Sequence, residues 1–278
     1  MKIYHLNCGS MREIDPAGQG PGGPARALNH CLLVETDDDG LVLVETGFGT
    51  VDVRRPVESL GQTFLDRTAA LLLEEQTALA QVRALGYAVE DVRHILLTHL
   101  DLDHCGGLPD FPDATVHVHD AEYRVAMATS HPHPEHSLRY RPAHWAHRPH
   151  WQTYSAAKKN RWFGFDAIEL EGLPADDFLL IPLAGHTEGH CAVAVRDGAR
   201  WLLHAGDAYY HQGEIDPAGR WSIPGFELLE EVSEVHRPLR MAQHARLREL
   251  LRDHGDQVDV FSAHDPWTYQ RYEAIMAG

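Results

Sequence analysis

The chain has 278 residues, of which 44% are hydrophobic, and its formal net charge is −17. A chain of this length buries a sizeable core, and we expect a single domain over residues 1–278. The acidic excess would repel a nucleic-acid backbone or an anionic membrane surface, because both partners require clustered Lys and Arg. The composition therefore argues against nucleic acid and membrane as partners and leaves a small molecule as the expected substrate.

Neither secretion nor thiol chemistry is indicated. The N-terminal residues lack the apolar core of a secretory signal, and no later stretch approaches the roughly 20 apolar residues that span a bilayer, so we expect a cytoplasmic protein. The four cysteines are scattered without a CxxC pair, which favours buried thiols over a disulfide framework. The unusual number is 21 histidines, because histidine is the commonest metal ligand among side chains.

The first part of the chain predicts strands followed by a long helix. Residues 30–36 and 41–45 are typical of a β-hairpin closed by an Asp-Gly turn. Apolar residues at helical spacing predict a helix over Thr63–Leu85, which Gly86 would end. The next predicted elements are a buried strand at 93–98, a strand at 115–119 and a helix at 120–128.

The middle of the chain, about residues 129–162, is rich in His, Pro, Arg and aromatics without a sustained period, which predicts an irregular insertion or lid. Its histidines either bind metal or lie in solvent, and we favour solvent. Its aromatic residues either form an apolar wall over a substrate or bury a dimer contact: Trp145, Trp151, Tyr154 and Trp162.

Strand signals then resume, and each is followed by polar residues. The predicted strands are 178–183, 191–196, 200–204 and 258–262, with helices at 237–254 and after Pro266. Strand-end loops on a rigid sheet are where catalytic groups collect. We therefore expect an α/β (α+β) protein with two mixed sheets and helices outside.

A dense group of candidate metal ligands follows the strand at 93–98. Four of them lie within six residues and alternate with leucines: His99, Asp101, Asp103 and His104. Imidazole and carboxylate together suit zinc, iron or manganese. The alternative is a polar loop with capping aspartates, which two histidines at this spacing make the weaker interpretation.

Three further candidate metal ligands also come shortly after apolar strands. His186 lies in a glycine-flanked turn between two strands, Asp207 follows the strand at 200–204, and His264 follows the last strand. Each alone is a weak signal. In this order, after apolar strands, they indicate one site.

With these motifs the sequence resembles the metallo-β-lactamase superfamily, whose signature is H-x-H-x-D-H, a GH-[ST]-x-GH turn, an aspartate and a late histidine. The resemblance runs from about residue 28 to 268. It implies a four-layer αββα sandwich and two divalent metal ions about 3.5 Å apart, zinc first, with iron or manganese as alternatives. It further implies that His99, Asp101 and His186 hold the first metal, that Asp103, His104 and His264 hold the second, and that Asp207 bridges them.

Two positions depart from the family pattern. Asp101 stands where the family has its second histidine, which favours a harder metal or a weak first site. Glu45 replaces the aspartate of the family's early Asp-Thr-Gly, and we expect it to support the site from behind the ligands.

The resemblance is strongest to the N-acyl homoserine lactonases, the quorum-quenching hydrolases. By that likeness a metal-bound hydroxide would attack a lactone or carboxylic ester, Asp103 would orient it, and Tyr210 would hydrogen-bond the substrate; alternatively Tyr210 only packs beneath the site. His190 is expected to be a structural hydrogen-bonding residue.

Other functions on this fold stay open. They are a thioester hydrolase of the glyoxalase II type, a diiron oxidoreductase with a carboxylate at the position of Asp101, and a metal-stabilised binding module without catalysis. The acidic balance disfavours the first, because the family's thioester hydrolases have a basic C-terminal region. No flavin-binding domain follows, which disfavours the second. We expect a monomer or homodimer.

Overall fold

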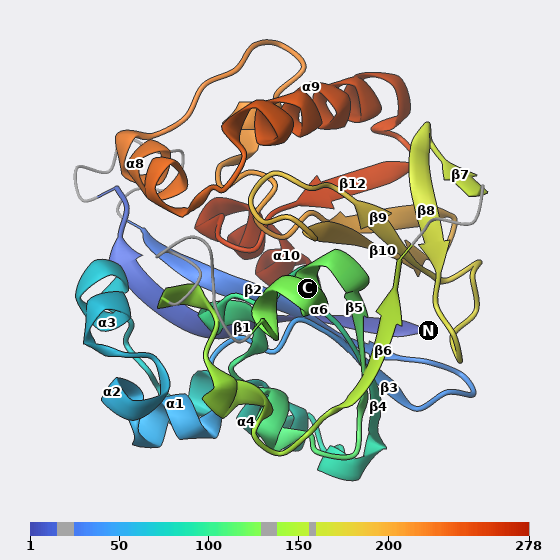
Figure 1. Cartoon of the computed structure of the whole chain (residues 1–278). Helices are drawn as coiled ribbons and strands as arrows, with labels where there is room; N and C mark the ends of the chain where they lie inside the picture. The colour runs from blue at the N-terminus through green and yellow to red at the C-terminus, as the bar shows by residue number, and fades with distance from the viewer. Residues whose placement is uncertain (16–24, 129–137, 156–159, 278) are drawn as a thin grey trace.

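The computed structural model describes residues 1–15, 25–128, 138–155 and 160–277. They form two six-stranded sheets (Figure 1). The first has the order β1 (Lys2–Glu13), β2 (Arg26–Glu35), β3 (Leu41–Val44), β4 (Val92–Leu96), β5 (Thr115–His119) and β6 (His150–Tyr154). The second has the order β12 (Val258–Phe261), β11 (Arg200–His204), β10 (Cys191–Asp197), β9 (Phe178–Pro182), β8 (Phe165–Glu169) and β7 (Asn160–Trp162).

Helices cover the outer face of each sheet, which gives the predicted four-layer αββα arrangement (Figure 1). Side chains of α4 and α6 join the core of the first sheet, and side chains of α9 join that of the second. No helix of the described residues is both long and apolar enough to span a bilayer. The helices are α1 (Thr50–Arg54), α2 (Pro56–Ser59), α3 (Gln62–Thr68), α4 (Ala78–Ala84), α5 (Leu102–Cys105), α6 (Asp120–Ala126), α8 (Pro224–Ser233), α9 (Arg237–His254) and α10 (Pro266–Ala277).

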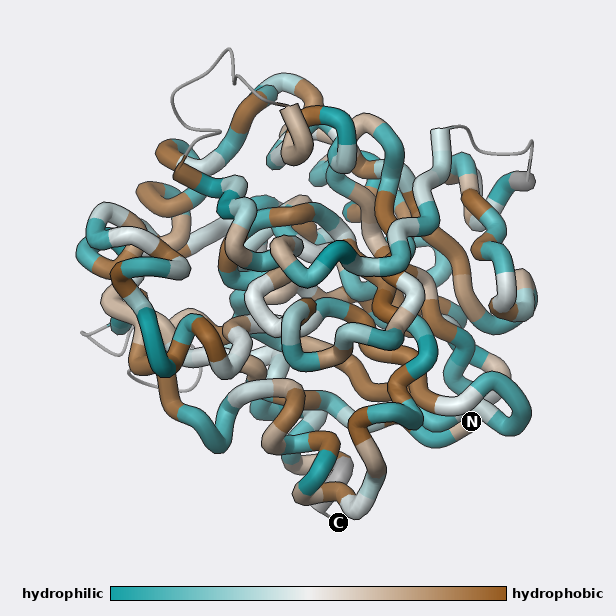
Figure 2. Tube along the Cα trace, turned by 60° about the horizontal axis from the view of Figure 1, so that its bottom comes forward, coloured by the Kyte–Doolittle hydropathy of each residue, from teal (hydrophilic) through white to brown (hydrophobic). Residues whose placement is uncertain are grey.

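The predicted hairpin shows why the layers form. β2 and β3 pair antiparallel, and successive side chains of a strand point to opposite faces. Leu32 and Val42 therefore join the core between the sheets, whereas Leu33 and Leu43 join the core beneath the outer helices. Both faces of these strands are buried, which explains their unbroken apolar runs. Figure 2 shows hydrophobic stretches along the central strands and hydrophilic loops outside them.

The strand directions bring several loops to one edge. β11 and β12 are parallel, and β9 runs in the same direction because β10 is antiparallel to both β9 and β11. The backbone N–H of Cys191 donates to the carbonyl of Thr98 at 2.9 Å, which joins the start of β10 to the segment that follows β4. The loops after β4, β9, β11 and β12 consequently meet.

The long helix predicted over Thr63–Leu85 is wrong. α3 ends at Thr68, and Ala69 and Leu72 adopt positive φ angles of 45° and 50°, which no α-helix allows. The backbone N–H of Leu71 donates instead to the carbonyl of Ser10 on β1. A new helix, α4, then begins after Thr77, whose side chain caps it by accepting from the N–H of Ala80.

The irregular insertion predicted over 129–162 is wrong in part. Residues 150–154 form β6, which pairs in parallel with β5, and Asn160–Trp162 form β7. His144 is buried rather than solvated. Residues 129–137, with three of the segment's histidines, lie outside the described residues. Strands β1 and β8 and helix α8 were not predicted, although all three border the core.

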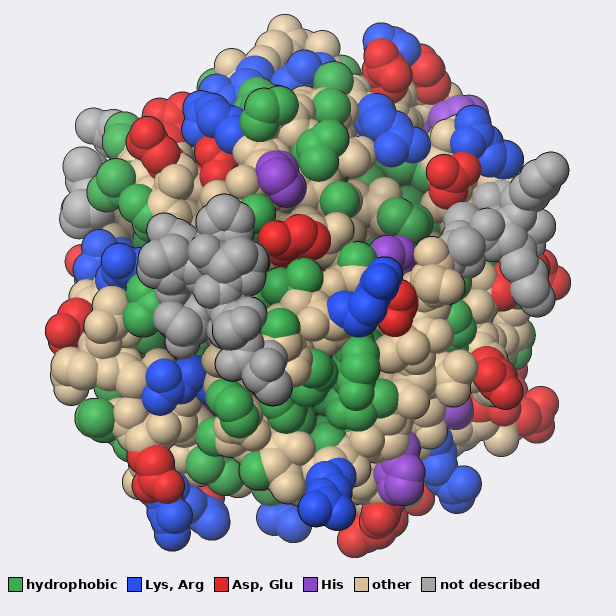
Figure 3. Space-filling view, viewed as in Figure 1, with side chains coloured by type: hydrophobic (Ala, Val, Ile, Leu, Met, Phe, Trp, Pro, Cys, Tyr) green, Lys and Arg blue, Asp and Glu red, His purple; other side chains and the backbone are tan. Residues whose placement is uncertain are grey.

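Charged side chains of both signs are spread over the face shown in Figure 3, and no single basic area dominates it.

Candidate metal centre

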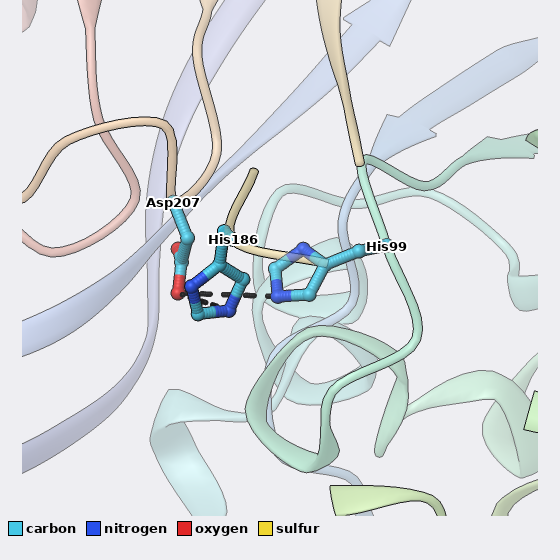
Figure 4. Close-up of side chains that lie close together, drawn as sticks. All are labelled: His99, His186 and Asp207. Carbon is cyan, nitrogen blue, oxygen red and sulfur yellow. Dashed lines mark ion pairs between the residues drawn. The ribbon is translucent and has the colours of Figure 1, made fainter. Parts of the chain in front are cut away.

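The predicted ligands converge where the loops after β4, β9, β11 and β12 meet. Two triplets have potential ligand atoms within 4.8 Å of one another. The first is His99, His186 and Asp207, whose side chains point toward one another in Figure 4. The second is Asp103, His104 and His264. Of the seven residues predicted to bind metal, only Asp101 stands outside both triplets.

In the first triplet, Asp207 Oδ2 lies 3.4 Å from His186 Nε2 and 3.9 Å from His99 Nε2. Asp101 approaches the same histidines with its Oδ2, which is 3.0 Å from His186 Nε2 and 3.5 Å from His99 Nε2. Its other oxygen, Oδ1, lies 3.4 Å from Nη1 of Arg139. The two oxygens of Asp101 thus have different neighbours.

In the second triplet, Asp207 presents its other oxygen. Oδ1 lies 3.3 Å from His104 Nε2 and 3.1 Å from His264 Nε2. Asp103 completes this side, with Oδ2 at 3.8 Å from His264 Nε2. His264 Nε2 also lies 3.1 Å from Asp207 Oδ2, so the carboxylate of Asp207 lies between the two triplets and contacts both.

The residues present fit metal ions. Three buried atoms that face the centre have no hydrogen-bond partner among the described residues: Nε2 of His99, Nε2 of His104 and Oδ1 of Asp207. Oδ1 of Asp101 accepts no hydrogen bond either, but it has an ion-pair partner in Arg139. Buried polar atoms are normally paired, because an unpaired one loses its hydration without compensation. Converging lone pairs of imidazole and carboxylate are what divalent zinc, iron or manganese require.

The electrostatics of the cluster also suit cations. Burial lowers the pKa of His99 to about 3, so its ring is neutral and has a lone pair to offer. Burial alone would raise the pKa of Asp207, but His264, His104 and His186 outweigh it and hold that pKa well below its usual value. Burial raises the pKa of Asp103. Asp101, Asp103 and Asp207 lie close together, and bound cations would stabilise their charged carboxylates.

The histidine rings are fixed from behind. Glu45 Oε2 lies 2.9 Å from His104 Nδ1, and its Oε1 accepts the N–H of Thr98 at 2.6 Å, so the predicted contact of Glu45 with the site is present. Glu45 has a positive φ of 63°, an uncommon conformation that points to a functional constraint. His264 Nδ1 donates to the carbonyl of Leu28 at 2.8 Å. Such contacts leave each Nε2 free to face the centre.

Two further predicted residues also contact Asp207. The hydroxyl of Tyr210 donates to Asp207 Oδ2 at 3.1 Å and lies 3.0 Å from Oγ of Ser233. His190 Nε2 accepts the backbone N–H of Asp207 at 3.0 Å, and its Nδ1 donates to the carbonyl of Leu183 at 3.2 Å. The predicted structural role of His190 is therefore confirmed.

A cavity opens over the cluster, and it is mainly apolar. Asp101, Asp103, Asp207, Tyr210 and His264 lie on its wall. None of the four aromatic residues predicted to wall a substrate site lines it; Trp145 and Trp151 pack on the first sheet's core and Trp162 on the second's. The apolar lining is Met11, Ala27, Phe64, Leu102, Leu138, Phe226, Leu229 and Val232, and the cations are Arg12, Arg67 and Arg139.

Two buried residues that support the loops were missed. Glu122 accepts from the N–H of Leu100 at 3.0 Å and from Oγ1 of Thr187 at 2.6 Å, so it ties the loop of His99 to the turn of His186. Arg139 contacts Asp101. Neither follows a strand or belongs to a motif, and nothing in the sequence distinguishes Arg139 from its neighbours in a Pro- and His-rich segment.

Comparison with known proteins identifies relatives along nearly the whole chain. The family model described as metallo-beta-lactamase superfamily matches residues 26–256. A probable metallo-hydrolase of Mycobacterium tuberculosis is 43% identical over 274 residues, which cover 97% of this chain and 82% of that protein. The N-acyl homoserine lactonase AttM of Azorhizobium caulinodans is 30% identical over 273 residues, covering 96% and 94%.

Solved structures show the same fold. An N-acyl homoserine lactone hydrolase with the product N-hexanoyl-L-homoserine bound at its catalytic metal centre superposes with a TM-score of 0.66 at 21% identity, covering 97% of this chain and 95% of that one. The dizinc quorum-quenching lactonase AidC superposes with a TM-score of 0.61 at 19% identity, covering 95% and 87%.

Proposed function

The chain belongs to the metallo-beta-lactamase superfamily and is a probable metallo-hydrolase, and we propose that it cleaves a lactone or carboxylic ester of a small molecule. One observation carries the proposal: the carboxylate of Asp207 lies between two histidine-containing triplets, in contact with both, at the wall of an apolar cavity. That arrangement suits two metal ions that share a carboxylate.

The proposed ligands of the first metal are His99, Asp101 and His186, and those of the second are Asp103, His104 and His264, with Asp207 between them. When bound, a pair of divalent ions lowers the pKa of a bound water and polarises the substrate carbonyl. We propose zinc, because the dizinc lactonase shares the fold.

The chain's own residues would orient the substrate. Tyr210 lies at the cavity wall between Asp207 and Ser233. On substrate binding its O–H would turn from Asp207 Oδ2 to donate to the carbonyl or ring oxygen of a lactone. Asp103 Oδ2 lies on the side of the centre shared with His264, where it accepts a proton or a hydrogen bond from the attacking water. The apolar lining excludes bulk water and accepts an acyl chain.

The lactone part of the proposal is supported by the relatives. AttM is an N-acyl homoserine lactonase, and the N-acyl homoserine lactone hydrolase described above holds the product N-hexanoyl-L-homoserine at its catalytic metal centre. We therefore propose an acyl homoserine lactone, the substrate of quorum-quenching enzymes, as the first compound to assay, in a cytoplasmic enzyme.

The test is metal content together with hydrolysis on one sample. Protein purified without chelator is analysed for zinc, iron and manganese per chain, and then assayed with N-hexanoyl homoserine lactone, an aryl ester and an acyl thioester. We expect two metals per chain, lactone or ester turnover, and loss of turnover after chelation that added zinc restores. Turnover of the thioester alone would replace the proposed substrate class, and turnover that survives complete metal removal would refute the metal-dependent reaction.

A further inference from the structure

The carboxylate of Asp101 adds a negative charge to the centre at a position where the superfamily motif has a neutral imidazole. Its two oxygens divide their contacts. Oδ2 lies 3.0 Å from His186 Nε2 and 3.5 Å from His99 Nε2, whereas Oδ1 lies 3.4 Å from Nη1 of Arg139. Asp101 therefore stands between the first triplet and a permanent cation, since a guanidinium stays charged in proteins.

Arg139 is held in place by more than this carboxylate. It is only 9% exposed, and besides this ion pair its guanidinium donates hydrogen bonds to the carbonyl of His186 at 3.5 Å and to the carbonyl of Ser233. Ser233 is the last residue of α8, and the carbonyls at a helix C-terminus attract cations. The planar guanidinium thus contacts three segments at once: the turn between β9 and β10, the end of α8 and the loop after β4 that includes Asp101. These contacts fix its orientation.

The other arginines of the cavity do not share this role. Arg12 donates to the backbone carbonyl of Asp66 at 3.5 Å, and Arg67 is exposed. Among the described residues, the ion-pair contacts of Asp101 are with His99, His186 and Arg139. The structure consequently offers Asp101 one arginine partner, which contacts Oδ1 while Oδ2 lies near the rings of the two histidines.

We propose that Asp101 and Arg139 act as one unit, in which the arginine balances the charge that the aspartate adds, so that the pair replaces a neutral histidine ligand. The inference rests on the proposed function, because it takes Asp101 as a ligand of the first metal. Arg139 is a positioning residue: it holds Oδ1, and Oδ2 is left to face the metal. A charged arginine without its carboxylate would sit, buried, beside a dication and repel it.

This unit makes an unusual prediction for the substitution that restores the family motif. D101H should weaken zinc binding at the first site, because Arg139 then lacks its partner. D101H/R139M should recover it, because methionine fills similar space without charge. R139K keeps the charge and should resemble the unsubstituted protein. R139M alone should retain both zinc ions, since its unpaired carboxylate still attracts a dication.

The experiment measures zinc per chain and first-site zinc affinity by competition with a chromogenic chelator, with no activity assay involved. We expect D101H to lower first-site zinc affinity by about tenfold or more. D101H/R139M should return the affinity to within about threefold of that of the unsubstituted protein. A recovery of this size lies within the coupling energies that contacting residues show in double-mutant cycles. D101H/R67M is the matched control: it removes a cation of the same cavity that does not contact residue 101, and it should not recover affinity.

The outcomes separate the two proposals. If D101H and D101H/R139M bind the first zinc equally, the charge unit is refuted while the metal centre stands. If the unsubstituted protein binds no metal, the proposed function fails. Circular dichroism and the unfolding midpoint establish that each variant folds; should D101H not fold, D101N and D101N/R139M pose the same question with an isosteric neutral side chain.

Discussion

Among the described residues, the metal centre has a counterpart: a second cluster of carboxylates and histidine that lies in the interior but holds a side-chain cation of its own. The second cluster consists of Glu214, Glu230 and His244, whose potential ligand atoms also lie within 4.8 Å of one another. Its centre is filled by the guanidinium of Arg240, with Nη1 at 2.5 Å from Glu230 Oε1, 3.8 Å from Glu214 Oε2 and 3.1 Å from His244 Nε2. The chain supplies the cation itself.

The metal centre differs because no arginine or lysine among the described residues enters its two triplets. Its one guanidinium contact is at the edge, from Arg139 to the outer oxygen of Asp101. Residue composition alone therefore does not separate a metal site from an internal ion network. What separates them is whether a side-chain cation already occupies the point where the ligand atoms converge.

The largest effect is expected at Asp207. D207A removes the carboxylate that faces both triplets, and we expect loss of both metals and a fall in kcat/KM of about a thousandfold or more, as for removal of a metal site's central charge. Metal analysis and hydrolysis kinetics measure this. D113A, at an exposed position, is the control and should keep both metals. Full metal content in D207A would contradict the assignment.

R240M should have the opposite effect to D207A: it should lower the free energy of unfolding and leave the metal content unchanged. R240M leaves the buried carboxylate of Glu230 without its cation and removes one of the two arginine partners of Glu214 and of Glu234, which costs about 3–5 kcal/mol. Urea denaturation gives the free energy of unfolding. If R240M instead binds one more metal ion per chain, the cluster is a metal site that Arg240 blocks. The two clusters would then differ only in whether a metal ion or an arginine occupies them.

Tyr210 tests whether contact with the metal centre means catalysis. Y210F should lower kcat by about a hundredfold with metal content unchanged, because it removes the hydroxyl at the cavity wall that we propose as a hydrogen-bond donor to the substrate oxygen. The adjacent Tyr209 is the matched control: it packs in the core of the second sheet, its hydroxyl has no hydrogen-bond partner among the described residues, and Y209F should leave kcat unchanged. Equal kcat values in both variants would mean that Tyr210 only packs.

The smallest effect concerns acid stability of the second cluster. Burial lowers the pKa of His244 to about 4 from 6.5, so the ring is neutral when folded. Because the pKa is lower in the folded protein than in the unfolded chain, His244 contributes fully to the free energy of unfolding above pH 6.5. This contribution is lost as the pH falls toward 4, and about 2 kcal/mol is lost by pH 5. Between pH 7 and pH 5, H244Q should lose less free energy of unfolding than the unsubstituted protein. Equal losses, with H150Q at an exposed position as control, would refute this.

The convergence of the candidate ligands was predictable because each follows an apolar strand, and strand ends are recognisable from local pattern. His99 follows β4, and Asp207 and His264 follow β11 and β12, which are parallel neighbours. The same local logic failed at residues 69–77, where apolar spacing persists but the backbone pairs with β1 instead of continuing a helix.

Arg139 and Glu122 could not be predicted for a different reason. Arg139 meets Asp101 through tertiary contacts between segments 38 positions apart, and Glu122 reaches Thr187 across 65 positions. Neither residue has a spacing that marks it. The same holds for Arg240, whose role depends on the buried acids brought to it by α8 and the turn after β11. Sequence pattern locates ligands, but not the cations that accompany or replace them.

A crystal structure of zinc-loaded protein with anomalous scattering recorded at the zinc edge tests the central claim most directly. The account predicts two peaks, one on each side of Asp207, the first among His99, Asp101 and His186 and the second among Asp103, His104 and His264, with none among Glu214, Glu230 and His244. No peak beside Asp207, or a peak in the cluster of Arg240, would contradict it.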